Sequence, residues 1–206
     1  MRHIRFDRAL ALDLEMTCWA EGAPPEGRTP EIIQIGLAEA DLRAGTITRS
    51  VSQLVRPADL RLSAYCTELT GLMAEDLKYR GLPLGQALNR LAKTWPLRTR
   101  PVFVWGDDVD ALRREASAKG ARGDLIADSH NLHALFRALA QAHPDGPPGS
   151  GSGISVPDAL EMLGRAFEGR RHDAETDAVN TARILLALGQ QVWRFRHSRD
   201  TTTSPL

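Results

Sequence analysis

An acidic pair inside an apolar stretch is the first feature of the sequence that suggests chemistry. Residues 8–16 read RALALDLEM, and Asp13 and Glu15 lie two positions apart in this run. Successive side chains of a strand alternate between its faces, so both carboxylates are expected on the same face. Neighbouring carboxylates in a partly dry site repel each other and resist ionisation, which a bound cation relieves. Acidic side chains also protect edge strands from aggregation, so the pair alone does not identify a site.

Two further groups of polar residues follow predicted elements. Asp107, Asp108 and Asp110 come after the apolar run PVFVW, where a buried strand is expected to pass into a helix. A carboxylate at that point also serves as a helix N-cap. His172 lies in a Gly- and Arg-rich loop before a long predicted helix, and Asp177 falls in the first turns of that helix. Carboxylates and water are the ligands that Mg²⁺ and Mn²⁺ prefer, so the three groups together predict a divalent-metal site.

The elements that must position these groups form one α/β pattern. Strands are expected at 8–19, 31–42, 46–57, 101–105 and 124–129, and helices at 63–72, 82–95, 107–120, 131–143, 156–167 and 174–193. Three strands followed by alternating helices and strands predict a single domain with a mixed sheet, over residues 1–196. The stretch PDGPPGSGSG, 144–153, is expected to be a mobile loop, and 197–206 a flexible tail.

Composition limits the function classes. The chain has 206 residues with 26 basic and 26 acidic side chains, and zero net charge argues against a protein that coats polyanions. An enzyme that holds only the end of a nucleic acid remains compatible with this balance. Two cysteines, Cys18 and Cys66, form neither a disulfide framework nor a metal knuckle. We find no apolar run of spanning length and no signal-peptide pattern, so we expect a soluble cytoplasmic protein without membrane contact.

The order of these motifs resembles that of the DEDDh (DnaQ-like) 3′→5′ exonucleases, which have the ribonuclease H-like fold. ALDLEMT matches the first motif of that family with Asp13 and Glu15, and HDAETD matches the third with His172 and Asp177. The similarity extends over about residues 8–190. EIIQIGLAEAD, LSAYCTELTGL and FEGRRH are similar to segments of the branch that contains the enhanced-RNA-interference and KapD-like exoribonucleases. The resemblance implies a ribonuclease H-like mixed sheet flanked by helices.

The second motif departs from the pattern of that branch. The branch usually has Trp-Gly-x-x-Asp, whereas WGDDVD has valine at the last of these positions. In the family, a core apolar residue follows the aspartate of this motif four residues later. Asp108 precedes Leu112 at that spacing and Asp110 precedes an arginine, so Asp108 is preferred, with Asp107 and Asp110 as alternatives.

The resemblance also implies a mechanism. Two divalent ions, Mg²⁺ or Mn²⁺, are expected on Asp13, Glu15, Asp108 and Asp177, with Asp13 between them, and His172 is the expected general base. The implied reaction releases nucleoside 5′-monophosphates from the 3′ end of single-stranded nucleic acid, with short RNA favoured. A DNA-directed 3′→5′ exonuclease is the alternative substrate class. A non-catalytic nucleic-acid-binding or regulatory protein on the same fold is the alternative outside enzymes.

Family members also suggest where the substrate lies. Backbone and side chains directly after the glutamate contact the terminal nucleotide in the family, which implies Met16 and Thr17 here. Leu72 is the expected wedge against the terminal base, and Arg170 is a candidate phosphate ligand. The expected assembly is a monomer or a homodimer, because the end of the helix predicted at 174–193 offers spare apolar side chains.

Overall fold

A computed structural model of the chain describes residues 3–142 and 153–197, with 191–197 described as backbone only. The loop and the tail that the sequence suggested at 144–153 and 197–206 lie almost entirely outside these residues. The described elements are β1 (Arg8–Met16), β2 (Ile32–Asp41), β3 (Thr46–Leu54), α1 (Ala64–Thr70), α2 (Ala74–Arg80), α3 (Leu84–Thr94), β4 (Val102–Val104), α4 (Asp108–Ala118), β5 (Ser129–Asn131), α5 (Leu132–Ala142), α6 (Val156–Met162) and α7 (Ala174–His197). None of the helices in this part of the chain combines the length and apolar character needed to cross a membrane.

One five-stranded sheet forms the centre of the molecule, in the order β3-β2-β1-β4-β5. β1 pairs antiparallel with β2, and β2 with β3, whereas β1–β4 and β4–β5 are parallel. The mixed sheet predicted from the sequence is therefore confirmed. Because β1 and β4 are parallel neighbours, their carboxyl ends point to the same edge of the sheet. Asp13 and Glu15 lie in the last part of β1, and Asp108 follows β4 at the start of α4.

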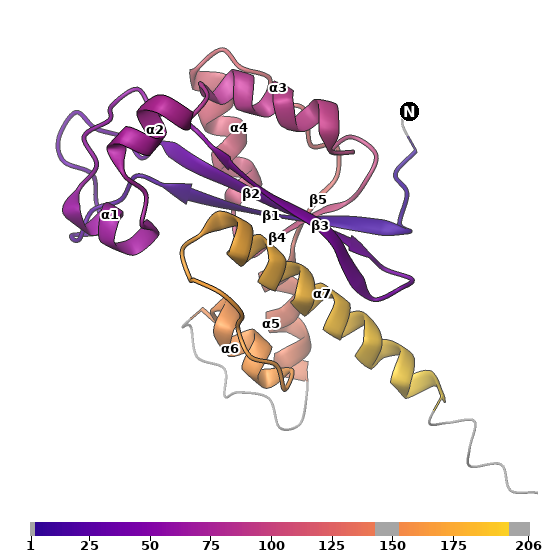
Figure 1. The fold of residues 1–206 in the computed structure, drawn as a ribbon. Coiled ribbons are helices and arrows are strands. Elements are labelled where there is room, and N and C mark those ends of the chain that lie inside the picture. Colours follow the sequence, from indigo (N-terminus) through magenta and orange to yellow (C-terminus); the bar gives the residue numbers. More distant parts are fainter. Residues whose placement is uncertain (1–2, 143–152, 198–206) are drawn as a thin grey trace, which may run out of the picture.

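The two faces of the sheet carry different helices (Figure 1). Leu10, Leu12 and Leu14 of β1 pack with α3 and α4 in the larger apolar cluster. Small side chains cover the opposite face, where Ala11 and its neighbours on β2 contact α7 at Ala178. The alternation of β1 therefore places Asp13 and Glu15 on the α7 face, two and four residues beyond Ala11. Small residues on this face allow α7 to lie close to the sheet.

Two predicted elements differ from the structure. The strand expected at 124–129 is wrong, because the described strand is Ser129–Asn131. Leu125 and Ile126 are buried, but they belong to the apolar cluster of α3 and α4 rather than to a strand pairing. The helix expected at 156–167 ends at Met162, before Gly164 adopts a positive φ of 68°. The short helix α2 was not expected from the sequence.

Candidate active site

Strand β1 places the acidic pair near its own carboxyl end. Asp13 lies opposite Gly36 of β2 and Glu15 opposite Gln34, so both are held by regular antiparallel pairing. Glu15 is buried, with only 8 % of its surface exposed. Asp13 is partly buried beside it. Pairing with β2 therefore fixes the backbone that carries the two carboxylates, while β4 pairs with β1 only at Leu10 and Ala11 and, within the described part of the chain, leaves the other side of Asp13 and Glu15 without a strand partner.

The start of α4 supplies a third carboxylate. Asp108, the first residue of α4, lines the same cavity as Asp13 and Glu15. Asp107 and Asp110 line a different cavity, beside β5, and Asp110 is paired with Arg113 at 3.3 Å. Of the three aspartates in the second motif, the structure thus brings only Asp108 to the acidic pair.

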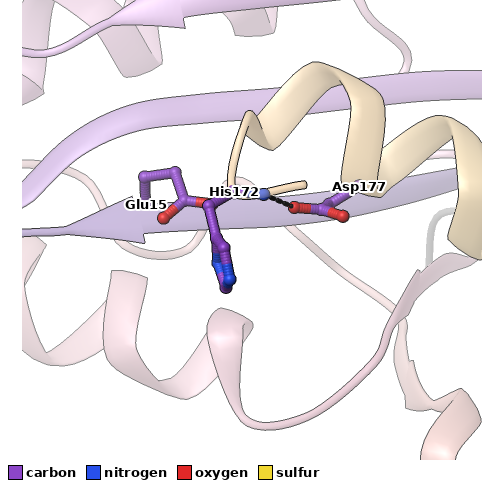
Figure 2. A group of neighbouring side chains, drawn as sticks. All are labelled: Glu15, His172 and Asp177. Atoms are coloured by element: carbon purple, nitrogen blue, oxygen red, sulfur yellow. Dashed lines mark hydrogen bonds between the residues drawn. The ribbon is translucent and has the colours of Figure 1, made fainter. Parts of the chain in front are cut away.

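The loop before α7 brings the last two predicted residues to the site. The backbone N–H of His172 donates to Asp177 Oδ2 at 2.8 Å (Figure 2). His172 has φ 59°, a left-handed conformation that is uncommon for a residue with a side chain. One ligand atom from each of Glu15, His172 and Asp177 lies within 4.8 Å of the others. The loop therefore bridges the five-residue separation: the backbone N–H of His172 meets the carboxylate of Asp177, and the imidazole lies near the carboxylates of Glu15 and Asp177.

The cavity has a volume of about 330 Å³ and is shared by all five predicted side chains. Its other walls come from Trp105, which follows β4, from Arg171, and from Ser155, Val156 and Pro157 at the start of α6. Trp105 Nε1 donates to the carbonyl of Ile154 at 3.0 Å, which fixes the indole against that wall. One side of the cavity is thus acidic, and another side is apolar.

The carboxylates of this cavity resist ionisation. Burial, reinforced by repulsion from the neighbouring carboxylates, raises the pKa of Asp13 well above its usual value and that of Glu15 to about 8. Burial also raises the pKa of Asp108 and of Asp177 to about 6, although backbone N–H bonds act in the opposite direction. Burial and the nearby Arg171 and Arg170 charges lower the pKa of the fifth residue, His172. Divalent cations would relieve this repulsion, so the donor set fits a metal site.

Two of the predicted substrate contacts, Met16 and Thr17, directly follow Glu15. Thr17 is buried, and its Oγ1 accepts a hydrogen bond from the N–H of Glu31 at 2.9 Å. The carbonyl of Met16 lies 3.8 Å from the Cys66 sulfur. Neither residue lines the cavity of the five predicted side chains.

The other two, Leu72 and Arg170, lie near the end of α1. Leu72 is partly buried and packs against the cluster of Cys66 and Leu77. Arg170 donates from Nη2 to the carbonyls of Glu68 and Leu69, both at 3.3 Å, so it caps the carboxyl end of α1 in this structure. Its charge still acts on the site, because it lowers the pKa of Glu15 against the larger effect of burial.

Sequence reasoning missed the contact between two polar residues that support the site. Gln34 on β2 and Asp173 at the start of α7 are joined by a 3.0 Å hydrogen bond. The available signal was a glutamine within IIQIG, since a polar side chain inside an apolar strand must have partners when it is buried. The wall formed by Ser155, Val156 and Pro157 had no signal in the sequence beyond a helix start.

Comparison with known proteins gives the family. A family model described as exonuclease (RNase_T) matches residues 10–185. The chain belongs to this exonuclease family. It is 30% identical to "3'-5' exonuclease Snipper" of Drosophila melanogaster over 96% of this chain and 74% of that protein. It is 26% identical to "ERI1 exoribonuclease 2" of Xenopus laevis over 87% of this chain, but it spans only 28% of that protein.

Solved structures of exonucleases share the fold. The nuclease domain of 3'hExo, described as a DEDDh family member bound to rAMP, matches with a TM-score of 0.77 at 22% identity. The match covers 92% of this chain and 94% of that one. The ribonuclease H-like architecture and the exonuclease family expected from the motifs are therefore confirmed.

Proposed function

We propose that this chain is a metal-dependent 3′→5′ exonuclease that releases nucleoside 5′-monophosphates from single-stranded nucleic acid, with short RNA favoured over DNA. The observation that carries the proposal is the single cavity on which Asp13, Glu15, Asp108, His172 and Asp177 meet. The name of the Drosophila relative and the family membership agree with the reaction and its direction.

The carboxylates are the proposed metal ligands. Asp13, Glu15, Asp108 and Asp177 offer oxygen donors of the kind that Mg²⁺ and Mn²⁺ prefer. Among the described residues, Arg171 is the one cationic side chain that lines the cavity, and Arg170 acts on Glu15 by its charge. Two such ions, when bound, would activate a water molecule and stabilise the charge of the leaving 3′-oxygen.

His172 is the proposed general base. An imidazole is a poorer ligand than a carboxylate for Mg²⁺, so its place at the metal-binding group favours a role toward water instead. The ring would take a proton from the attacking water as its oxygen bonds to phosphorus. The bond between phosphorus and the leaving 3′-oxygen then breaks, and that oxygen gains a proton. The products are a nucleoside 5′-monophosphate and a strand with a new 3′-hydroxyl.

The preference for RNA rests on the relatives. One relative is named an exoribonuclease, and the structural neighbour holds rAMP. In this account Met16 and Thr17 contact the terminal nucleotide through backbone and side chain, Leu72 lies against its base, and Arg170 reaches a phosphate. RNA is told from DNA by its 2′-hydroxyl, so a contact to that group would set the preference.

Digestion of short 5′-labelled RNA and DNA strands of matched sequence tests the function. With Mg²⁺ or Mn²⁺ we expect a ladder that shortens from the 3′ end, faster on RNA, and no cleavage in EDTA. Asp177→Asn and Asp108→Asn should abolish the ladder, whereas Asp110→Asn should leave it unchanged. Faster DNA cleavage would assign the DNA-directed alternative. Intact strands under every condition would contradict the enzyme and favour a nucleic-acid-binding protein.

A further inference from the structure

Gln34 makes an unusual set of contacts for a side chain on a central strand. The residue is 2 % exposed, and its amide lies on the α7 face of the sheet, where it contacts Asp173 and Ala174. Nε2 donates to Asp173 Oδ2 at 3.0 Å and to Ser52 Oγ at 2.8 Å. Oε1 accepts from the N–H of Ala174 at 3.1 Å. Two of the three partners thus belong to the start of α7, and the side-chain amide makes both contacts because it donates to a carboxylate through its NH₂ group and accepts from a backbone N–H through its oxygen.

The backbone contact beside Gln34 brings the same helix end close to the sheet. A Cβ added to Gly36 would lie 1.8 Å from the carbonyl oxygen of Ala174, a distance that no side chain tolerates. The start of α7 therefore rests directly on β2. Gln34 and Gly36 share one face of this strand, so the hydrogen bonds and the close approach act on the same turn of α7.

The contact at Asp173 extends to the proposed catalytic residues. Asp173 Oδ1 accepts from the N–H of Thr176 at 3.0 Å, so one carboxylate is bonded both to Gln34 and to the helix. The carbonyl of Asp173 accepts from the N–H of Asp177 at 2.9 Å. Asp177 in turn accepts from the N–H of His172, whose left-handed backbone must be held by its surroundings.

We infer that Gln34 is a positioning residue for His172 and Asp177. Its amide fixes the start of α7 on β2, and the helix start sets the loop conformation that points the imidazole into the cavity. The inference rests on the proposed function, because it assigns Gln34 to the reaction of that site. It differs from a merely stabilising role in the effect expected at the His172 backbone.

Gln34→Met is the first variant, because methionine keeps the length and apolar contacts but makes none of the three hydrogen bonds. Gln53→Met is the matched control: Gln53 is also buried on a strand, and its amide donates to the carbonyl of Leu54, away from α7. With metal and RNA, Gln34→Met should lower kcat roughly tenfold to a hundredfold. KM should change less than about threefold, because the variant removes hydrogen bonds within the protein and no contact to the bound substrate. Gln53→Met should leave kcat unchanged.

The second measurement needs no activity. The amide resonance of His172 reports its hydrogen bond to Asp177 in the metal-free protein. We expect a clear shift of this resonance in Gln34→Met and none in Gln53→Met. If the wild type cleaves no strand in the digestion, the proposed function is contradicted. The comparison of the two resonances still decides whether Gln34 orders the loop.

Exchange of the amide and the carboxylate gives a rescue experiment. Gln34→Glu alone places two carboxylates against each other and should lower kcat. Gln34→Glu with Asp173→Asn restores a donor and an acceptor across the same contact, and asparagine remains a good helix cap. We expect the double variant to recover most of kcat and the wild-type His172 resonance. The inference is overturned if the pair recovers no more than the single variant, or if Gln34→Met and Gln53→Met behave alike. If Gln34→Met does not fold, the exchanged pair alone decides.

Discussion

Two glutamates in the first two strands are about equally buried, yet their surroundings are opposite. Glu39 on β2 is 3 % exposed and Glu15 on β1 is 8 % exposed. Glu39 accepts from Arg8 at 3.1 Å and from Arg49 at 3.2 Å, and these contacts outweigh burial and lower its pKa. Glu15 faces other carboxylates, and burial together with their repulsion raises its pKa to about 8.

The difference shows which buried carboxylate is compensated by cationic side chains of the chain itself. Glu39 has its cations within the chain, so it serves the structure. The carboxylates around Glu15 have no such partners of comparable closeness in the described residues, so their compensation must come from outside the chain. We therefore treat the raised pKa values at that end of the sheet as a sign of function, as perturbed groups in a cavity often are.

The largest expected effect is a difference in activity between a variant of the carboxylate cluster around Glu15 and a variant of Glu39. Asp13→Asn should lower the rate of 3′-end digestion by at least about a thousandfold, because it removes a proposed metal ligand. Glu39→Gln should stay within about twofold of the wild type, since Glu39 lies outside the cavity. Initial rates on labelled RNA with saturating Mg²⁺ measure both. Equal losses in the two variants would remove the distinction.

The next effect is a gain in stability. Glu15→Gln in EDTA at pH 8 should raise the free energy of unfolding by about 2 kcal/mol, because it removes a desolvated and repelled charge. Urea unfolding of the metal-free protein measures this change. Glu161→Gln, at an exposed position on α6, is the control and should change little. A Glu15→Gln variant less stable than the wild type in EDTA would show that the carboxylate is already compensated.

The opposite result is expected at the other glutamate. Glu39→Gln should lower the free energy of unfolding by about 1 kcal/mol, a value kept small because Arg8 and Arg49 are about 40% exposed. The same urea experiment applies, with added Mg²⁺ making no difference to the loss. A neutral or stabilising substitution would mean that the ion pairs do not offset the burial of this carboxylate.

The smallest effect is a difference in pH dependence. Because the pKa of Glu15 is raised from 4.5 to about 8, the folded protein keeps a proton on Glu15 between these pH values, whereas the unfolded chain releases it. The contribution of this proton to the free energy of unfolding is therefore complete below pH 4.5 and is lost as pH rises toward 8, at roughly 0.6 kcal/mol per pH unit on average. The lowered pKa of Glu39 gives stability above pH 4.5 that is lost on acidification. In EDTA, the free energy of unfolding should fall less steeply between pH 5 and 9 in Glu15→Gln than in the wild type. Identical slopes would contradict the raised pKa of Glu15.

Local patterns were sufficient for much of the fold. Alternation in β1 placed Asp13 and Glu15 on one face, and Ser63 and Gly71 marked both ends of α1, where Ser63 Oγ accepts from the N–H of Cys66. α2 was missed because its N-cap, Met73, makes no side-chain cap and seven residues give little periodicity. The strand beside β4 was misplaced because apolar residues at 125–126 signal burial without specifying pairing.

The candidate site was predicted in its residue types but not in its geometry. The order of the motifs indicated the carboxylates and the histidine, and the spacing to Leu112 favoured Asp108. Asp107 and Asp110 stayed open as alternatives because the sequence does not place α4 relative to β1. The contact between Gln34 and Asp173 joins residues 139 positions apart, a separation over which a single sequence carries no pairing signal. The loop geometry at His172 depends on a local hydrogen bond from its N–H to Asp177, which the spacing alone does not indicate.

A calorimetric titration with Mn²⁺ near pH 7 tests the central claim most directly. Buffers of different ionisation enthalpy report the protons released, and metal can bind only as Glu15, whose pKa is raised to about 8, loses its proton. We predict binding of about two ions with net proton release in the wild type, loss of this binding in Asp13→Asn, and its retention in Glu39→Gln. Absence of binding at millimolar Mn²⁺, or unchanged binding in Asp13→Asn, would contradict the account of this cavity as a metal-dependent active site.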